Sequence, residues 1–481
     1  MFYKSQLFAL YLLLIFLSPI SLANNDLPEI GTVGASALTI EKEKEYGWAF
    51  NMMANQALPI IDDPILNHYI SELGQNIVSH ADSVKVPFKF FLVEDEEINA
   101  AAFLGGNVKI HTGLFLYANT ESELASVIAH EVAHITQRHL ARMLEQQALT
   151  NPASMAALAG SILIAFVSPA AGIAALSTTL AVNAQNQINY TRLHEYEADR
   201  IGIQTLANAG YDPYGMANFF GKLAEKYKYA TLPPQILATH PLPETRLAEA
   251  RLRAAQMNKS NIKSSLSYQL SKVRITVRYH RLTASVLIDK YQTQIKHNKY
   301  QLKEAAEYGL ALAYFKNKDY KNAYKLNNKL LANDPYNLFY IDFSADIALA
   351  TNNAKKAVKS LLLYEKRFPG NEVILLNLVI ALQENKQYDF AEKKLEFFLR
   401  SHSDHILAHK VAIELYKIMQ EKAKEYAMRG EYLALLGRFR EASQQMGSAL
   451  IYTDRKLDKA RYSAKIEEFR RADIRLQTLQ K

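Results

Sequence analysis

Residues 120–136, TESELASVIAHEVAHIT, decide much of the fold. The segment opens with a capping box, a threonine followed three residues later by a glutamate, and apolar side chains then recur at helical spacing. This pattern predicts a long helix from about Glu121 to Gln147. Because each residue turns a helix by about 100°, His130 and His134 lie on one face, one turn apart.

The pattern His-Glu-x-x-His at residues 130–134 indicates a metal site. Two imidazoles four residues apart on a helix can both bind one zinc ion. Glu131 lies about 100° round from His130, close enough to act as a general base on a zinc-bound water. The alternative is an amphipathic helix whose two histidines pack or form hydrogen bonds, so a third ligand has to decide between the two.

The segment HEYEAD at residues 194–199 offers that ligand on a second predicted helix. Glu195 and Asp199 are four residues apart and share a face. Glu195 can complete a site of two histidines and one glutamate, while Asp199 can accept the free ring N–H of a histidine ligand. Three neighbouring residues are expected to take no part: Glu197, which points elsewhere, His139, an ordinary polar residue, and His194, which faces away from Glu195.

His-Glu-x-x-His on one helix and Glu-x-x-x-Asp on a later one resemble the gluzincin metallopeptidases, which include CAAX prenyl endopeptidases and exported bacterial proteases. The resemblance implies peptide-bond hydrolysis by an α+β zincin-type protease domain. By position it also implies one zinc ion per chain bound by His130, His134 and Glu195, with Glu131 as the catalytic base and Asp199 supporting a ligand.

Two strands are expected ahead of the motif helix, at residues 86–93 and 108–112. The second strand, through Val108, Ile110 and Thr112, is the predicted edge on which an extended substrate pairs its backbone. Residues 99–108 resemble the family's segment leading into the strand beside the cleft. This chain has Leu104 where the family usually has proline, which affects substrate placement but no catalytic atom.

A histidine in a proline-stiffened loop, His240 in THPLP at residues 239–243, is a further candidate. The family resemblance places a His-Pro element beside the metal. His240 either occupies the fourth zinc position in a resting state or stabilises the tetrahedral intermediate. The remaining alternative is an ordinary surface loop.

An uncharged segment separates the two motif helices, because residues 146–191 contain no Asp, Glu, Lys or Arg. Within it, residues 153–182 are rich in Ala, Leu and Ile but are broken by Gly160, Pro169 and Gly172. A membrane-spanning helix needs about 20 unbroken apolar residues. The pieces favour a helical hairpin near the site, acting as a flap or touching a membrane; ordinary packing and true insertion are the alternatives.

The C-terminal half has an internal repeat. Its period of 34 residues is that of tetratricopeptide (TPR) helix pairs, and it relates Ala323, Ala357 and Ala391, and also Pro335, Pro369 and Ser403. Four helix pairs are predicted, with residues 404–427 degenerate, which makes an all-α TPR solenoid. The predicted organisation is a signal peptide (1–23), a zinc metalloprotease domain (24–258), a helical linker (259–302) and the TPR domain (303–475).

Composition narrows the compartment and the partners. The chain has 481 residues and no cysteine, which excludes disulfides, iron–sulfur clusters and a cysteine nucleophile. Lys4, the apolar run 7–17 and the small-x-small site at 21–23 predict export, and thus a periplasmic protein. Residues 24–260 carry a net charge of −8 and residues 261–481 one of +15. The basic half has two interpretations: its charges are scattered over solvated helix faces, or they bind an anionic or lipid-headgroup partner. Nucleic acid is not an expected partner.

The family resemblance further implies a role in outer-membrane quality control. The expected function is an exported zinc endopeptidase with chaperone-like activity that assists assembly of outer-membrane β-barrel proteins and degrades misassembled ones. Its expected partners are unfolded or stalled barrels and, through the TPR domain, the barrel assembly machinery. The rival is a TPR scaffold or chaperone with a vestigial or permanently closed zinc site, against which the intact Glu131 argues.

Overall fold

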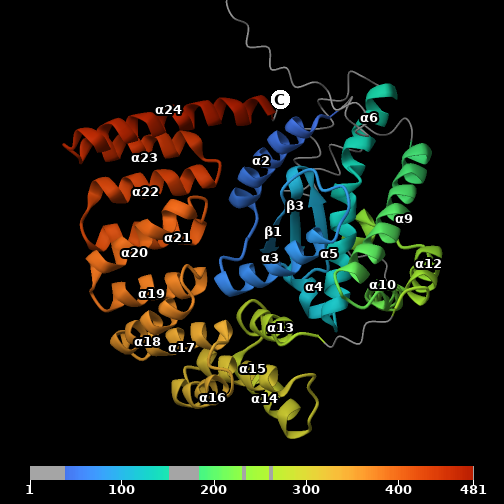
Figure 1. Cartoon of the computed structure of the whole chain (residues 1–481), viewed down its shortest axis with the longest axis horizontal. Coiled ribbons are helices and arrows are strands. Elements are labelled where there is room, and N and C mark those ends of the chain that lie inside the picture. The colour runs from blue at the N-terminus through green and yellow to red at the C-terminus, as the bar shows by residue number, and fades with distance from the viewer. Residues whose placement is uncertain (1–37, 151–183, 230–234, 259–263, 480–481) are drawn as a thin grey trace, which may run out of the picture.

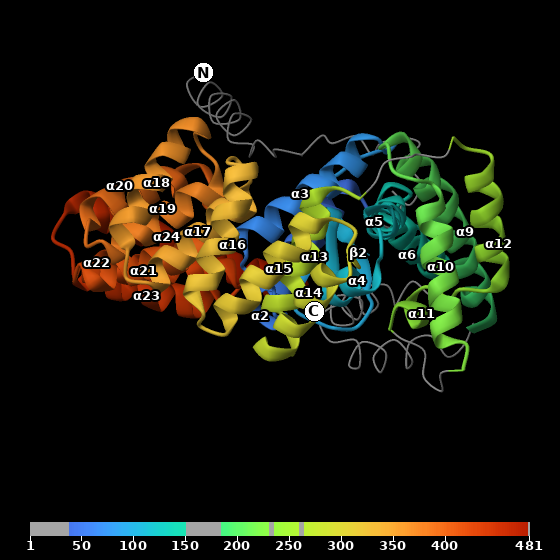
Figure 2. The ribbon, with the colours of Figure 1, turned by 90° about the horizontal axis from the view of Figure 1, so that it is seen from below.

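The computed structural model describes residues 38–150, 184–229, 235–258 and 264–479. An α+β unit is followed by an array of helices that curves alongside it (Figures 1 and 2), as the sequence predicts. The predicted export signal and the uncharged segment 153–182 lie outside these residues. In the described parts of the chain, no helix combines the length and the hydropathy needed to cross a membrane.

A three-stranded sheet with the order β1-β3-β2 forms the centre of the α+β unit. The central strand β3 (Asn107–His111) pairs in parallel with β1 (Lys89–Val93) and antiparallel with β2 (Ala100–Phe103). The two predicted strands are confirmed, whereas β2 was not foreseen.

The predicted substrate edge through Val108, Ile110 and Thr112 is wrong. Val108 and Ile110 lie on a strand whose two sides are both paired, and Thr112 is already the first residue of α4 (Thr112–Tyr117). The edge strands are β1 and β2 instead, because in the described residues the ladder of each pairs with β3 only.

A glycine contact joins the sheet to the first described helix, α2 (Ile40–Ala57). Between β2 and β3 the chain turns through η1 (Leu104–Gly106), where Gly105 has a φ of 72°, a conformation that favours glycine. A Cβ built on Gly105 would lie 2.8 Å from the Cα of Gly47 on α2. Both positions therefore need glycine for the helix to rest on the turn.

Helices cover the sheet and bury an apolar core that includes Leu92, Val108, Ile110, Ile128 and Ile203. Figure 2 shows the helices that follow the motif helix gathered at the far end of this unit from the helical array. These following helices are α6 (His139–Thr150), α9 (Ala184–Asn208), α10 (Tyr214–Tyr227), α11 (Gln235–Thr239) and α12 (Glu244–Ala255), while α3 (Pro64–Ser79) and the motif helix α5 (Glu121–Thr136) pack against the sheet.

The predicted single helix over residues 121–147 is wrong, because it is broken between α5 and α6. Arg138 adopts a left-handed conformation at the break, with a φ of 53°. Its buried guanidinium donates hydrogen bonds to Glu43 Oε2 at 3.1 Å and to the carbonyl of Leu38 at 2.5 Å. A tertiary ion pair therefore redirects the chain just after the metal motif.

The C-terminal array consists of antiparallel helix pairs, as the 34-residue period predicts. Its helices are α13 (Leu266–Arg278), α14 (Ala284–Lys296), α15 (Lys303–Lys316), α16 (Tyr320–Asn333), α17 (Leu338–Ala350), α18 (Ala354–Arg367), α19 (Glu372–Glu384), α20 (Tyr388–Ser401), α21 (Ile406–Ile418), α22 (Lys422–Leu435), α23 (Phe439–Ile451) and α24 (Lys456–Leu479). Residues 303–479 thus form five pairs rather than the predicted four, preceded by the pair α13–α14.

Residues 404–427 are not degenerate in structure. The turn inside each of four successive pairs contains a residue with positive φ, and these residues recur every 34 positions: Lys318, Asn352, Lys386 and Gln420. The fourth unit therefore keeps the backbone of the other three. Its apolar pattern is hidden in the sequence because a buried helix position is taken by His409, which is 4% exposed.

One buried arginine links the two units. Arg274 of α13 donates hydrogen bonds to Asp63 Oδ2 and to Asp342 Oδ2, both at 2.7 Å, and to the hydroxyl of Tyr308 at 3.1 Å. Asp63 also caps the N-terminus of α3, and Asp342 lies on α17. The same guanidinium thus holds the α+β unit, the first helix of the array and its second TPR pair together.

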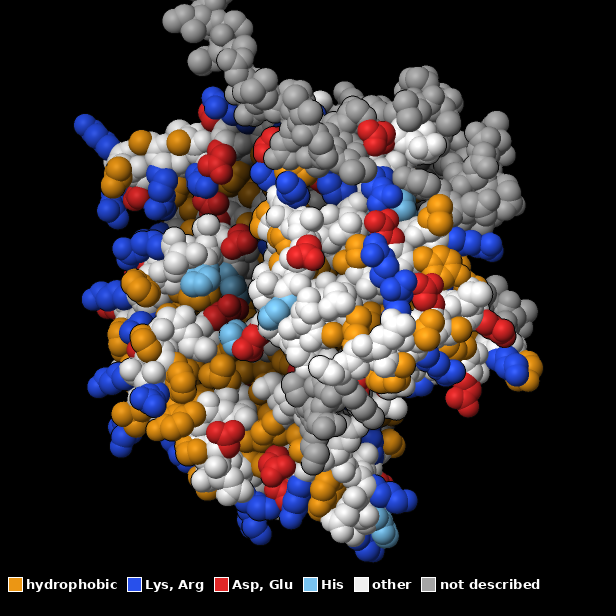
Figure 3. Space-filling model, turned by 45° about the vertical axis from the view of Figure 1, so that its right-hand side comes forward, with side chains coloured by type: hydrophobic (Ala, Val, Ile, Leu, Met, Phe, Trp, Pro, Cys, Tyr) orange, Lys and Arg blue, Asp and Glu red, His pale blue; other side chains and the backbone are white. Residues whose placement is uncertain are grey.

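The far end of the array returns to the α+β unit, where Figure 1 places the end of α24 beside α2. The guanidinium of Arg475 lies 4.5 Å from the ring centroid of Trp48, and its Nε lies 3.2 Å from Glu45 Oε1. The array is therefore attached at both ends. Lys and Arg side chains are spread along its outer rim, interleaved with apolar and acidic ones (Figure 3).

Replacing Arg274 by Met should lower the free energy of unfolding by about 3–5 kcal/mol, because it leaves two buried carboxylates without their partner. Urea denaturation measures the change. The matched control is Arg438→Met, which removes the exposed pair with Glu441 and should cost less than about 1 kcal/mol. Equal effects of the two substitutions would contradict the role assigned to Arg274.

Candidate metal centre

Four side chains from three separate segments converge beside the sheet. α5 contributes His130 and His134, α9 contributes Glu195, and the residue after α11 contributes His240. One nitrogen or oxygen of each lies within 4.8 Å of the others.

The donor set fits a tetrahedral metal ion. Nε2 of His130 lies 3.0 Å from Nε2 of His134 and 3.4 Å from Nδ1 of His240. Glu195 places its carboxylate oxygens 3.4 Å from the same nitrogen of His130, 3.3 Å from Nε2 of His134 and 3.1 Å from Nδ1 of His240. Four ligands about 2.1 Å from a zinc ion are held about 3.4 Å apart, which matches these separations.

A close helix contact produces this convergence. Gly202 of α9 lies against α5, where a Cβ would be 3.2 Å from both N and Cα of His130. Helical spacing places Glu195, Asp199 and Gly202 on one face of α9. Because Gly202 packs against α5 at His130, the two acidic side chains on the same face also point toward the histidines. Any larger residue would push the two helices apart.

Asp199 lies beside His130, with Oδ1 3.0 Å from Nδ1 of that histidine. Its second partner, an arginine on a distant helix, is not evident from the sequence. Arg246 of α12 donates two hydrogen bonds to this carboxylate, at 2.6 and 2.8 Å, and a third to the carbonyl of Pro241. Its Nη1 also lies 2.9 Å from Glu195 Oε2. One buried guanidinium therefore positions Asp199, Glu195 and the loop that carries His240.

The charges of these groups depend on one another. Burial opposes ionisation of Glu195, but the imidazoles of His240, His130 and His134 outweigh it and hold its pKa well below the usual range. Burial also disfavours a charged His130, yet Asp199 and Glu195 raise its pKa to about 10. Burial lowers the pKa of His134. Because a metal ligand must be deprotonated, a metal ion that binds His130 would compete with the proton that the two carboxylates favour there.

Glu131 occupies a distinct position beside the four donors. It is 1% exposed, and its Oε2 accepts a hydrogen bond of 2.8 Å from the backbone N–H of Ala102 on the edge strand β2. Its Oε1 lies 3.5 Å from Nε2 of His240. The carboxylate is thus fixed between the edge strand and the cluster.

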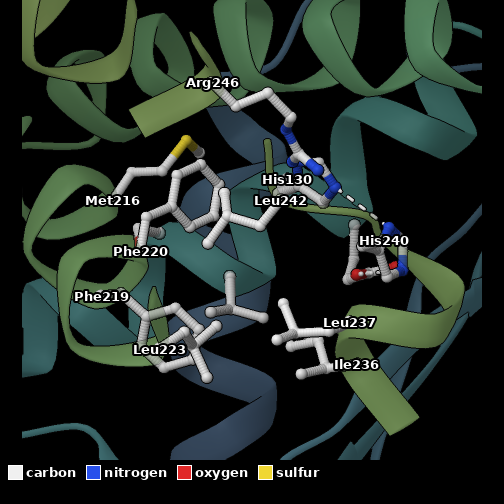
Figure 4. A pocket seen from close by; sticks show the side chains of 13 residues that line it. His130, Met216, Phe219, Phe220, Leu223, Ile236, Leu237, His240, Leu242 and Arg246 are labelled. Carbon is white, nitrogen blue, oxygen red and sulfur yellow. Dashed lines mark hydrogen bonds and ion pairs between the residues drawn. The ribbon is translucent and has the colours of Figure 1, made fainter. Parts of the chain in front are cut away.

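An apolar pocket opens next to His130 and Glu131. Figure 4 shows His130, His240 and Arg246 at one end of the pocket and hydrophobic side chains at the other. Its apolar lining comes mainly from α10, α11 and the loop after it: Met216, Phe219, Phe220, Leu223, Ile236, Leu237 and Leu242.

Three residues expected to take no part are instead packed around the site. His139 is 4% exposed and touches His134, because the break at Arg138 redirects α6. Glu197 pairs with His139, and His194 stacks on the ring of His139. Burial, followed by the nearby His134, lowers the pKa of His139. The expectation for His139 rested on continuous helical geometry, which the break at Arg138 removes, whereas Glu197 does point away from the four donors, toward His139.

The fold and the site define a metallopeptidase of the His-Glu-x-x-His type. The sequence profile of Peptidase family M48 matches residues 64–254. A relative from Vibrio cholerae is 42% identical over 93% of each chain. Beta-barrel assembly-enhancing protease from Escherichia coli is 40% identical over 93% of this chain and 92% of its own. Mitochondrial metalloendopeptidase OMA1 from Arabidopsis thaliana is 30% identical over 36% of this chain and 33% of its own.

We conclude that the chain belongs to peptidase family M48 and, within it, to the group of beta-barrel assembly-enhancing proteases. It is a metalloendopeptidase with a C-terminal TPR array.

Substitution of Arg246 should weaken metal binding, although this residue is not one of the four converging donors. Arg246→Met removes the bonds that orient Asp199 and Glu195, and we expect a loss of about 10–100-fold in zinc affinity, measured by competition with a chromophoric chelator. Arg251→Met, an exposed arginine on the same helix, serves as the control and should bind zinc like the wild type. An unchanged affinity in Arg246→Met would contradict the positioning role.

Proposed function

We propose that the chain is a zinc endopeptidase whose metal is held by His130, His134 and Glu195, with Asp199 orienting His130. The observation that carries the proposal is the convergence of these donors at tetrahedral spacing with Glu131 fixed beside them. Zinc, when bound, polarises the scissile carbonyl and lowers the pKa of a water molecule.

Glu131 moves the proton in this mechanism. Its Oε2 is held by Ala102, which leaves Oε1 facing the cluster to accept a proton from the attacking water. The same oxygen then delivers that proton to the leaving amine. Because the carboxylate is anchored on one oxygen, the other keeps its direction during both transfers.

The substrate is proposed to be an extended polypeptide that pairs with β2. This strand is an edge of the sheet and passes directly beside the base, since the backbone N–H of Ala102 donates a hydrogen bond to Glu131. An added strand would place a peptide bond near the metal, and the apolar pocket would accept a large hydrophobic side chain. β2 thus takes the role that the sequence analysis gave to residues 108–112.

The group to which the chain belongs suggests the physiological setting. We propose that the protein acts in the periplasm, assists assembly of outer-membrane β-barrel proteins and degrades those that stall. Unfinished barrels expose extended strands, which suit an edge such as β2. The TPR array is the proposed docking surface for the assembly machinery. Residues 153–182 are the proposed peripheral membrane contact. Nucleic acid is not a proposed partner.

His240 is proposed to restrain the enzyme. Its Nδ1 lies 3.4 Å from Nε2 of His130 and 3.1 Å from Glu195, a position suited to a fourth metal ligand. Four protein ligands close a zinc site, whereas three and a water make a catalytic one. Release of His240 would then open the fourth position.

The Glu131→Gln variant tests the protease function. It should retain about one zinc per chain, because Glu131 is not a ligand, and lose about 10²–10⁴-fold in casein hydrolysis with the loss of the general base. Zinc content and hydrolysis are measured together. Glu72→Gln, an exposed glutamate on α3, should behave like the wild type.

The same variant separates the protease from the rival scaffold. If Glu131→Gln restored outer-membrane protein assembly in a strain lacking the protein as fully as the wild type does, the scaffold or chaperone function would be favoured and the peptidase would be dispensable.

The His240→Ala variant tests the restraint. Casein hydrolysis and self-cleavage should rise several-fold while zinc stays bound by His130, His134 and Glu195. His80→Ala, an exposed histidine at the end of α3, is the control. Loss of activity with the metal retained would make His240 a catalytic helper, as its contact with Glu131 allows, and would refute the restraint.

A further inference from the structure

A second pair of buried histidines lies just outside the four-donor cluster. The rings of His139 and His194 stack with their centroids 4.2 Å apart and their planes inclined by 5°. They are 4% and 6% exposed. Neither is among the four converging donors, so their burial beside the site requires another explanation.

His139 connects the cluster to an ion pair. Its Nδ1 lies 2.9 Å from Nδ1 of His134, and its Nε2 lies 3.2 Å from Glu197 Oε2. The same oxygen of Glu197 accepts a hydrogen bond of 2.8 Å from Arg142 Nη1. His134 therefore has one ring nitrogen facing the cluster and the other facing His139.

Metal binding by His134 would determine the position of each proton in this chain of contacts. If His134 binds a metal through Nε2, its proton is on Nδ1, and this N–H must donate to Nδ1 of His139. Nδ1 of His139 must then be bare, so its own proton is on Nε2 and points at the Glu197 carboxylate. Every donor in the chain meets one acceptor.

We propose that His139 is a positioning residue for the metal centre, accepting the Nδ1–H of His134, and that Glu197, held by Arg142, fixes the tautomer of His139 that makes this possible. The two histidine ligands are then held in different ways. His130 faces a carboxylate, Asp199, whereas His134 faces a neutral imidazole that is itself backed by a carboxylate.

The contact between His139 and His134 depends on the break between α5 and α6. Five residues of continuous helix would turn His139 about 140° away from His134. The left-handed Arg138, fixed by Glu43, turns the first residue of α6 back toward the ligand. On α9, Glu197 lies about 200° from Glu195 and so faces α6 while Glu195 faces the cluster.

The proposal rests on the metal site proposed above, and it is tested by metal affinity and by the visible spectrum of the cobalt-substituted protein. His139→Leu removes the acceptor. It should lower zinc affinity by about 10–100-fold and shift the cobalt bands, because His134 is free to rotate. His139→Asn places an amide oxygen near the former Nδ1 and should recover most of the affinity and the wild-type spectrum.

A second substitution keeps the test decisive if the leucine variant does not fold. Glu197→Gln is nearly isosteric and touches no ligand, yet it replaces an acceptor by an amide N–H that can favour the opposite tautomer of His139. That tautomer would direct an N–H at the N–H of His134, so zinc affinity should fall. His68→Leu, an exposed histidine on α3, is the control.

The outcomes are separable. Wild-type affinity and spectrum in both His139→Leu and Glu197→Gln would overturn the proposal, and so would equal losses in His139→Leu and His139→Asn, which would indicate packing alone. A wild-type protein that binds no metal at all would refute the metal site rather than the role of His139.

Discussion

The close packing of α5 on α9 at Gly202 is the constraint on which the site depends. α5 carries His130 and His134, whereas α9 carries Glu195, so neither helix holds a complete set of donors by itself. Because Gly202 has no side chain, α9 approaches the backbone of His130 closely enough for Glu195 to reach both histidines. The cluster of metal-binding side chains therefore forms only when α9 packs closely on α5.

A layer of paired charge, buried at Arg246 and half-buried at Arg142, surrounds that interface and keeps the two helices in register. Arg246 neutralises Asp199 and Glu195 and binds the backbone of the loop that carries His240. On the opposite side, Glu197 with Arg142 supports His139 and, through it, His134. Buried charges are costly unless paired, so these pairs hold the ligand side chains in a narrow range of orientations.

Arginine side chains also attach the helical array to the protease unit. Arg274 joins α3, α13 and α17 at one end, and Arg475 covers Trp48 of α2 at the other. α2 in turn rests on the turn after β2 through Gly47 and Gly105. The proposed docking surface is thus connected, through α2, to the strand that is proposed to hold the substrate.

The sequence by itself determined the features that are local in the chain. Helical spacing placed His130, Glu131 and His134 on one helix and Glu195 and Asp199 on another, and the 34-residue period gave the helix pairs. Only the tertiary structure decided what depends on distant contacts. Glu43 holds Arg138 at the break in the motif helix and so brings His139 to His134, Arg246 reaches Asp199 from a separate helix, and pairing on both sides of β3 leaves β2 as the edge strand beside Glu131. Periodicity reports which residues share a face, whereas these contacts depend on how separate faces meet.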